Sequence, residues 1–137
     1  MSIQGEDIKR LIPQREPFIM VDSFSTTTDG AALTALTVSH GNYFLQGGQL
    51  AETGLIEHIA QSAAALAGYQ GQQQGEPRIG LIGEVKRFEC LRKPSLGEKV
   101  QTTVRFGFSM GNVTLATGEC RVGEETIATA QLKIFMQ

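Results

Sequence analysis

TGLIEHIAQSAAALAGYQGQ, from Thr53 to Gln72, reads as one long helix around which the rest of the chain is organised. Apolar residues recur at three- and four-residue steps, in rows such as Leu55, Ile59 and Leu66. Many of the other positions hold alanine, glycine or serine, which suits a helix that other backbone approaches closely. The stretch therefore predicts a helix covered by protein on most of its circumference, as when a curved sheet encloses it.

Two polar residues interrupt this apolar helix. Glu57 and Gln61 are one helical turn apart and so share a face, and a carboxylate there is costly to bury unless it is paired or used. Glu57 is the first functional candidate. The alternative is structural, because a carboxylate in the first turns of a helix favours the macrodipole and can bond free backbone amides. Thr53 is the predicted N-cap.

Size and composition indicate a single soluble domain, residues 1–137. The chain is 41% hydrophobic and 19% charged, with a formal net charge of -2 and a pI near 5.7. Its Lys and Arg residues are scattered singly, so neither nucleic acid nor an anionic membrane is expected as a main partner. The opening MSIQGEDIKRLIP is no signal peptide and no stretch is long enough to span a membrane, so we expect a cytoplasmic protein.

The cysteines and histidines predict no metal site. Cys90 and Cys120 are far apart without CxxC spacing, and the chain has two histidines in all. Both cysteines are interpreted as reduced strand residues, and no cofactor is expected.

Strand-like segments lie on both sides of the helix. Asp29-Gly30 is the strongest local hairpin signal, and Asn42 to Leu50 is interpreted as a loop with a glycine pair. The chain also begins with a short amphipathic turn closed by Pro13. The predicted strands are residues 18–26, 31–39, 79–88, 99–109, 113–122 and 126–136.

Two strands, one wrapped helix and four antiparallel strands describe an α+β architecture, the hotdog fold, with a mostly antiparallel sheet around one long central helix. A single unit leaves one sheet edge open. Pairing two subunits into a continuous sheet covers that edge, so a dimer is expected.

Three segments resemble the bacterial 3-hydroxyacyl-acyl carrier protein dehydratases. LIPQREPFIMVDSF at Leu11–Phe24 resembles their opening segment, and GLIEHIAQSA at Gly54–Ala63 is similar to their helix signature. IGLIGEVKRFECLRK at Ile79–Lys93 looks like their next strand and turn. The likeness runs nearly end to end, and it implies the hotdog fold and acyl thioester chemistry.

The resemblance also implies a mechanism and a set of site residues. In that family a histidine removes the proton next to the thioester carbonyl, and the helix glutamate of the other subunit helps the β-hydroxyl leave as water. Backbone amides near the helix start, where Gly54 lies, hold the thioester oxygen, which agrees with the partial positive charge of a helix N-terminus. Glu57 matches the glutamate and Gln61 the glutamine.

The family histidine has no counterpart here, because Gly48 stands where it would be and the segment from there to Glu57 is several residues shorter. A positioned general base typically contributes a factor of about 100 to 10,000. Two histidines are tentative substitutes. His58 points about 100° away from Glu57 around the helix, and His40 ends a strand just before the loop.

The loop itself supplies further candidates for substrate binding. Tyr43 and Phe44 are interpreted as loop packing or as a lining for an acyl chain. Gly47 and Gly48 let backbone approach a thioester oxygen, or form a turn only. Gln61 is expected to orient Glu57 or to reach a dimer partner.

Three functions are consistent with the sequence. The first is an unusual dehydratase of acyl carrier protein or coenzyme A thioesters, with Glu57 working alone or with His40. The second is a catalytically silent subunit that binds an acyl chain or carrier protein and completes a dimer with an active, histidine-bearing partner, in fatty acid or polyene-type lipid biosynthesis. The third is a hotdog thioesterase in which Glu57 activates water. The expected assembly is a homodimer or, under the second function, a heterodimer.

Overall fold

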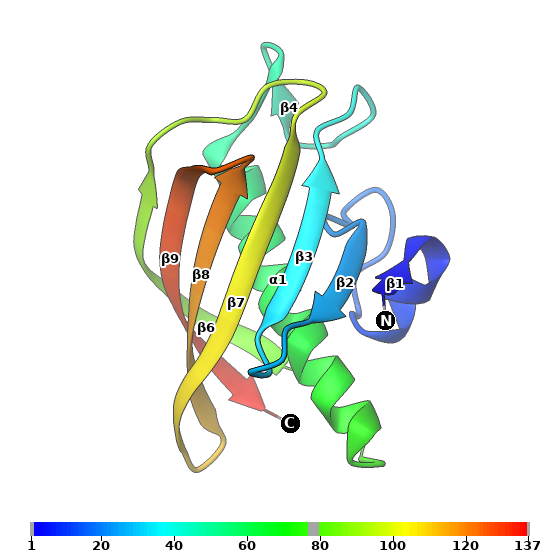
Figure 1. Ribbon diagram of the computed structural model, residues 1–137, viewed down its shortest axis with the longest axis vertical. Coiled ribbons are helices and arrows are strands. Elements are labelled where there is room, and N and C mark those ends of the chain that lie inside the picture. Colours follow the sequence, from blue (N-terminus) through cyan, green and yellow to red (C-terminus); the bar gives the residue numbers. More distant parts are fainter. Residues whose placement is uncertain (1, 77–79, 137) are drawn as a thin grey trace.

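A computed structural model describes residues 2–76 and 80–136, and it contains an antiparallel seven-stranded sheet curled around one long helix, α1 (Glu52–Gln73) (Figure 1). The strand order is β1-β2-β3-β7-β8-β9-β6, so the strand that follows the helix in sequence lies at one edge. This is the predicted hotdog arrangement. The strands are β1 (Ser2–Gln4), β2 (Ser23–Thr26), β3 (Ala32–Thr37), β4 (Leu45–Gln46), β5 (Gln49–Leu50), β6 (Gly80–Cys90), β7 (Lys99–Met110), β8 (Val113–Val122) and β9 (Glu125–Met136), and a 3-10 helix spans Gly5–Arg10.

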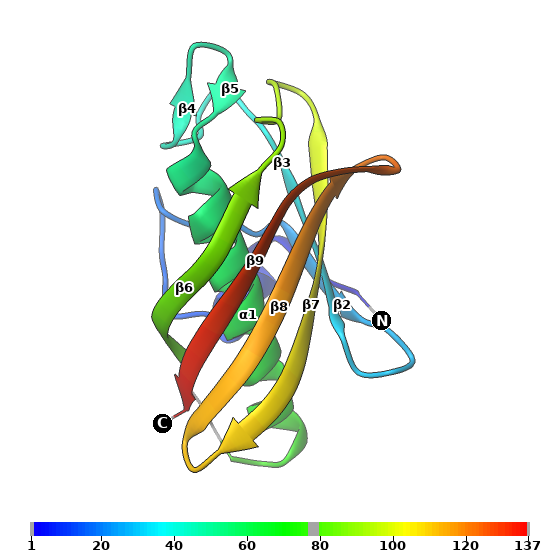
Figure 2. The ribbon, with the colours of Figure 1, turned by 90° about the vertical axis from the view of Figure 1, so that its left-hand side faces the viewer.

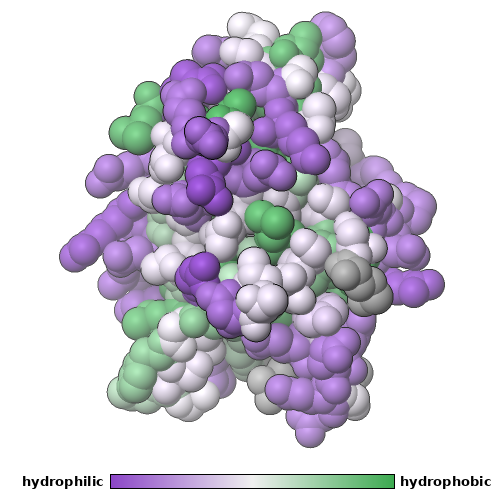
Figure 3. Space-filling view, in the orientation of Figure 1, coloured by the Kyte–Doolittle hydropathy of each residue, from purple (hydrophilic) through white to green (hydrophobic). Residues whose placement is uncertain are grey.

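The sheet forms because its long strands alternate between the core and solvent, as a half-buried strand requires. In β7, buried Val100, Thr102 and Val104 alternate with more exposed neighbours. The outer face of the sheet, which faces the viewer in Figure 3, is largely polar, and hydrophobic atoms gather at the lower left over the β7–β8 turn. Phe108 and Met110 lie there with relative exposures of 64% and 70%.

Small residues let α1 lie close to its surroundings on both sides. Ile59 packs over Gly118 of β8, where an added Cβ would come within 2.9 Å of the Ile59 side chain. On the other side, a Cβ at Gly68 would lie 2.3 Å from the carbonyl oxygen of Leu11. The helix is therefore enclosed between the sheet and residues 11–22 (Figure 2).

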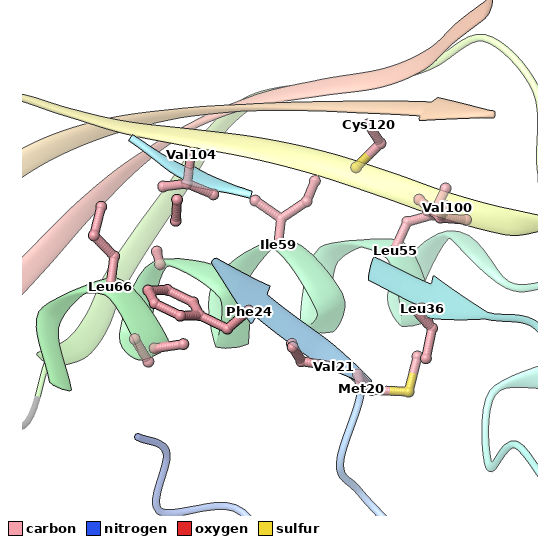
Figure 4. Close-up of a cluster of buried hydrophobic side chains, with 14 of the residues drawn as sticks. Met20, Val21, Phe24, Leu36, Leu55, Ile59, Leu66, Val100, Val104 and Cys120 are labelled. Atoms are coloured by element: carbon pink, nitrogen blue, oxygen red, sulfur yellow. The ribbon is translucent and has the colours of Figure 1, made fainter. Parts of the chain in front are cut away.

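The hydrophobic core fills the space between α1 and the sheet (Figure 4). Leu55, Ile59 and Leu66 project from the helix toward β7 and β2, and each is at most 1% exposed. These are the residues whose spacing predicted the buried helix. Among the described residues, no helix is both long and apolar enough to span a membrane.

One predicted strand was too long. Of residues 18–26 only Ser23–Thr26 is strand β2, and the part before it runs as an extended segment over α1. Its apolar character reflects burial against the helix, because the Met20 amide donates to a glutamine side chain of α1 and not to a neighbouring strand.

Smaller differences concern caps and loops. The predicted N-cap at Thr53 was wrong, since α1 begins at Glu52 after Ala51, whose side chain cannot cap. The predicted loop from Asn42 to Leu50 contains the β4–β5 hairpin, and strand β1 was not predicted. The predicted strand start at Ile79 lies outside the described residues.

Both cysteines lie in strands and are free, Cys90 in β6 and Cys120 in β8. Burial raises the pKa of the Cys120 thiol to about 11, so this thiol stays protonated at neutral pH.

Candidate active site

Glu57 lies half-buried on α1, beside the extended segment of residues 18–20 that crosses the helix. Its Oε1 accepts a hydrogen bond of 2.8 Å from Nε2 of Gln61, one turn further along the helix. The sequence predicted that these two side chains share a face. Within residues 2–76 and 80–136 the other carboxylate oxygen, Oε2, has no hydrogen-bond partner.

Gln61 is fully buried and every polar group of its side-chain amide is used. Nε2 donates to the carbonyl of Phe18 at 2.7 Å as well as to Glu57, and Oε1 accepts from the Met20 amide at 2.6 Å. A primary amide has two donor protons and so offers Glu57 only a donor here. Gln61 therefore fixes which carboxylate oxygen of Glu57 is engaged and which remains free to exchange a proton.

His58 has a structural role and does not face the same environment as Glu57. The ring is 0% exposed, with Nδ1 2.7 Å from the Met20 carbonyl oxygen and Nε2 2.7 Å from Oγ1 of Thr102. A carbonyl oxygen only accepts, so Nδ1 carries a proton. Burial lowers the pKa of His58, against smaller raising effects from the Met20 carbonyl and Asp22, and keeps the ring neutral.

The tentative catalytic role of His58 stays a prediction from the sequence, and the contacts of its ring in the structure are those of a residue that holds segments together. Both ring nitrogens are occupied by protein groups, which leaves none for a substrate. Instead the ring ties α1 to the extended segment through Met20 and to β7 through Thr102. The angle of about 100° around the helix axis between His58 and Glu57 predicts such a difference in environment.

His40 lies exposed in the turn that follows β3. In the described part of the chain its ring makes no hydrogen bond or ion pair, and nothing joins it to Glu57. The structure does not bring the two together, so His40 stays a candidate on sequence grounds.

Gly47 and Gly48 form the two-residue turn of the β4–β5 hairpin. Their φ angles are +59° and +79°, the left-handed values that a type I′ hairpin turn requires and that glycine adopts without strain. Gly48 thus offers no side chain where the family histidine would stand, and its carbonyl accepts from the Leu96 amide at 2.8 Å. The geometry accounts for both glycines as turn residues.

Three aromatic rings are in contact between the segment that crosses α1 and the residues just before β4. The Tyr43 ring centroid is 4.9 Å from that of Phe18 and 5.2 Å from that of Phe44, in edge contacts. Tyr43 is 61% exposed and Phe18 45%, whereas Phe44 packs against the core. Phe18 was missed by the sequence analysis, and only its backbone bond to Gln61 reveals its place beside the carboxylate.

Gly54 lies in the first turn of α1 under the β4–β5 hairpin. Its amide donates to the Ala51 carbonyl at 2.9 Å and is therefore engaged. An added Cβ would come within 2.7 Å of Cβ of Phe44, so the glycine permits close packing of the hairpin on the helix. The amides of Glu52 and Thr53, earlier in the same turn, have no acceptor within the helix because of their position.

The outer face of the sheet carries an open hollow of about 690 Å³ that none of the predicted site residues lines. Arg87, Arg105 and Arg121 surround it together with Glu89 and Glu119. It lies on the side of the sheet opposite α1, and its mixed charges indicate no particular ligand.

Comparisons with known proteins show which dehydratases the chain resembles. The family described as ApeP-like, ApeP dehydratase, matches residues 6–137. A 3-hydroxyacyl-[acyl-carrier-protein] dehydratase FabZ of Clostridium kluyveri is 27% identical over 146 residues, covering 99% of this chain and 96% of the relative.

Two solved structures show the same fold. The dehydratase heterocomplex ApeI:P of Xenorhabdus doucetiae contains a chain with a TM-score of 0.85 at 18% identity, covering 95% of this chain and 90% of that one. A Streptococcus mutans protein bound to acetyl CoA has a TM-score of 0.70 at 10% identity, covering 90% of this chain and 94% of that one.

Proposed function

Because the chain belongs to the ApeP-like dehydratase family, we propose that it is a subunit of a 3-hydroxyacyl thioester dehydratase to which it contributes Glu57. The base that removes the proton next to the thioester carbonyl comes from a histidine of a partner hotdog subunit. The substrate is a thioester of acyl carrier protein or coenzyme A. Support for a thioester comes from the names of relatives, which include a 3-hydroxyacyl-[acyl-carrier-protein] dehydratase and a hotdog protein bound to acetyl CoA.

One observation carries the proposal: Gln61 holds Glu57 by one oxygen and leaves the other free, in a chain that has no histidine available beside it. Protonated Oε2 gives its proton to the departing β-hydroxyl, which leaves as water, while the partner's histidine takes the proton next to the carbonyl. The donation from Gln61 Nε2 then stabilises the carboxylate that remains. The double bond forms between the two carbons, and the atoms and charges balance.

The unpaired edge of β6 supports the proposal that the chain binds a partner subunit. This strand pairs only with β9 among the described strands and leaves an edge of 11 residues unpaired. Such edges are normally covered, and a heterocomplex is named for the ApeI:P neighbour. A partner along β6 would place a second subunit beside α1.

The test compares the chain alone with the chain mixed or co-expressed with a histidine-bearing hotdog dehydratase. We expect no formation of enoyl thioester from a 3-hydroxyacyl thioester by the chain alone, even at high protein concentration. In the mixture, Glu57→Gln should lower turnover by a factor of about 100 or more, whereas Glu52→Gln, an exposed carboxylate on the same helix, should not change it.

Two results would overturn the proposal. One is robust dehydration by the chain alone that survives Glu57→Gln. The other is failure of the chain to form a complex with any histidine-bearing hotdog subunit encoded with it. Loss of the chain's own activity on His40→Ala would instead assign the base to His40 and remove the need for a partner's histidine.

A further inference from the structure

Arg92, just beyond the end of β6, is held by two carboxylates from two different turns. Its Nη1 donates to Oε1 of Glu98 at 2.7 Å and its Nη2 to Oε2 at 3.3 Å, a bidentate pair. Its Nε and Nη2 both donate to Glu125 at 3.1 Å. The cluster of Arg92, Glu98 and Glu125 therefore joins the β6–β7 turn (residues 91–98) to the start of β9.

The cluster also fixes the shape of the β6–β7 turn. Oε1 of Glu98 accepts from the Ser95 amide at 2.8 Å, and the Glu98 amide donates back to the Ser95 carbonyl at 2.9 Å. The backbone amides of Leu91 and Arg92 bond to the carbonyl of Ile127 in β9. The backbone at Arg92 is thus attached to β9, and the hydrogen bonds from its guanidinium to Glu98 join the two ends of the β6–β7 turn.

This turn is the support for the segments that surround the candidate site. On one side the Leu96 amide donates to the Gly48 carbonyl at 2.8 Å, and the Leu50 amide donates to the Pro94 carbonyl at 2.9 Å. On the other side, Val38, two residues before His40, exchanges two bonds with the turn, to Gly97 and Glu98. These bonds attach the β4–β5 hairpin, which leads directly into α1, to the sheet.

We propose that Arg92 is a positioning residue for the candidate site: by closing the β6–β7 turn it sets the place of the β4–β5 hairpin over the first turn of α1. Phe44, just before the hairpin, lies against Gly54 of α1. Tyr43 beside it contacts Phe18, whose carbonyl accepts from the Gln61 side chain that holds Glu57. The functional part of this inference rests on the proposed function, and the structural part does not.

The planar fork of arginine is what the cluster requires. An isolated exposed ion pair contributes little to a fold, and Arg92 is one-third exposed. Here, however, one guanidinium serves two carboxylates, one of which also accepts a backbone amide. Lysine keeps the charge but offers no bidentate fork, so it cannot hold both carboxylates in this geometry.

Hydrogen exchange of single backbone amides tests the structural part on the full chain. In Arg92→Lys we expect the amides of Leu50 and Leu96 to exchange at least about tenfold faster, while amides in the middle of β8 are unchanged. The matched control is Arg121→Lys, an arginine on the same sheet whose one ion pair is 3.7 Å long. It should leave all of these amides unchanged.

Kinetics of the complex with the partner dehydratase test the functional part. Because Arg92 touches no reacting atom, Arg92→Lys should raise KM several-fold and leave kcat within about twofold. Glu125→Gln should reproduce the effect, and combining the two substitutions should add little.

Two results would overturn the inference, and a third would overturn only the proposed function. Unchanged exchange at Leu50 and Leu96 in Arg92→Lys would remove it outright. Faster exchange spread evenly over all strands would show a general loss of stability and no positioning. If the complex has no dehydratase activity, the proposed function fails, and the exchange measurement alone still decides whether Arg92 holds the hairpin.

Discussion

At the scale of single residues, the candidate site depends on Gln61, whose side chain bonds to backbone groups that would otherwise pair with a neighbouring strand. Gln61 bonds to the amide of Met20 and the carbonyl of Phe18 much as a neighbouring strand would, and its remaining proton fixes Glu57. One buried side chain thus anchors an extended segment to a helix and orients a carboxylate. Its loss should affect both the fold and the site.

Gln61→Met keeps the volume of the side chain and removes its amide. The Met20 amide and the Phe18 carbonyl lose their partners, so we expect the free energy of unfolding to fall by about 2 to 4 kcal/mol. Urea denaturation measures this. Gln70 is on the same helix, and its side chain makes no hydrogen bond to any residue that the structure describes. Gln70→Met should change stability by less than about 0.5 kcal/mol, and equal losses in both variants would contradict the role of Gln61.

His58 makes stability depend on pH. Burial lowers its pKa in the folded chain, so below about pH 6.5 the unfolded chain binds a proton that the folded chain excludes. Stability is therefore retained above this pH and is lost as the pH falls from about 6.5 toward the lowered folded pKa.

Urea denaturation between pH 7.5 and 5.5 measures the dependence. The wild-type chain should lose more stability over this range than His58→Gln does, because glutamine has no proton to exclude. His40→Gln, which removes an exposed histidine, is the matched comparison. An unchanged slope in His58→Gln would assign the pH dependence to other groups.

At the scale of elements, the packing of α1 depends on positions without side chains. Gly68 is the clearest case, because its Cα lies against the backbone of Leu11 and that backbone cannot move aside as a flexible side chain can. The backbone at Leu11 therefore lies directly on the helix surface, ahead of the extended segment that bonds to Gln61 and His58.

Gly68→Ala should therefore destabilise the chain, although alanine is the better helix former. The added Cβ would lie 2.3 Å from the Leu11 carbonyl oxygen, and we expect a loss of about 1 to 3 kcal/mol, read from the urea midpoint. Gly107→Ala is the control, since its Cβ would meet only an ordinary contact at 3.8 Å. A Gly68→Ala chain as stable as the wild type would mean that the segment does not lie against the helix.

Sequence patterns reveal contacts between residues that are close together in the chain, and they do not reveal contacts between residues that are far apart. The helix was predicted from Thr53 to Gln72 and spans Glu52–Gln73, because its period and small residues are visible in one stretch. Glu57 and Gln61 were placed on one face for the same reason. The bond from Gln61 to Met20 joins residues 41 positions apart, so no spacing rule could reveal it.

At the scale of the whole molecule, the chain has the hotdog fold, and under the proposed function a partner subunit completes its reaction centre. The sheet wraps α1, and the outer edge of β6 is unpaired among the described strands. Glu57 is half-buried, and within residues 2–76 and 80–136 no histidine is hydrogen-bonded to it. Both features are explained if a second subunit pairs along β6 and brings its histidine.

The most direct test of this account is subunit-specific mutation in the purified complex with a histidine-bearing dehydratase, followed by turnover of a 3-hydroxyacyl thioester. The account predicts that Glu57→Gln in this chain lowers kcat about as far as removing the partner's histidine, by a factor of about 100 or more, and that both changes together lower it little further. A complex that keeps its kcat within about threefold after Glu57→Gln would contradict it.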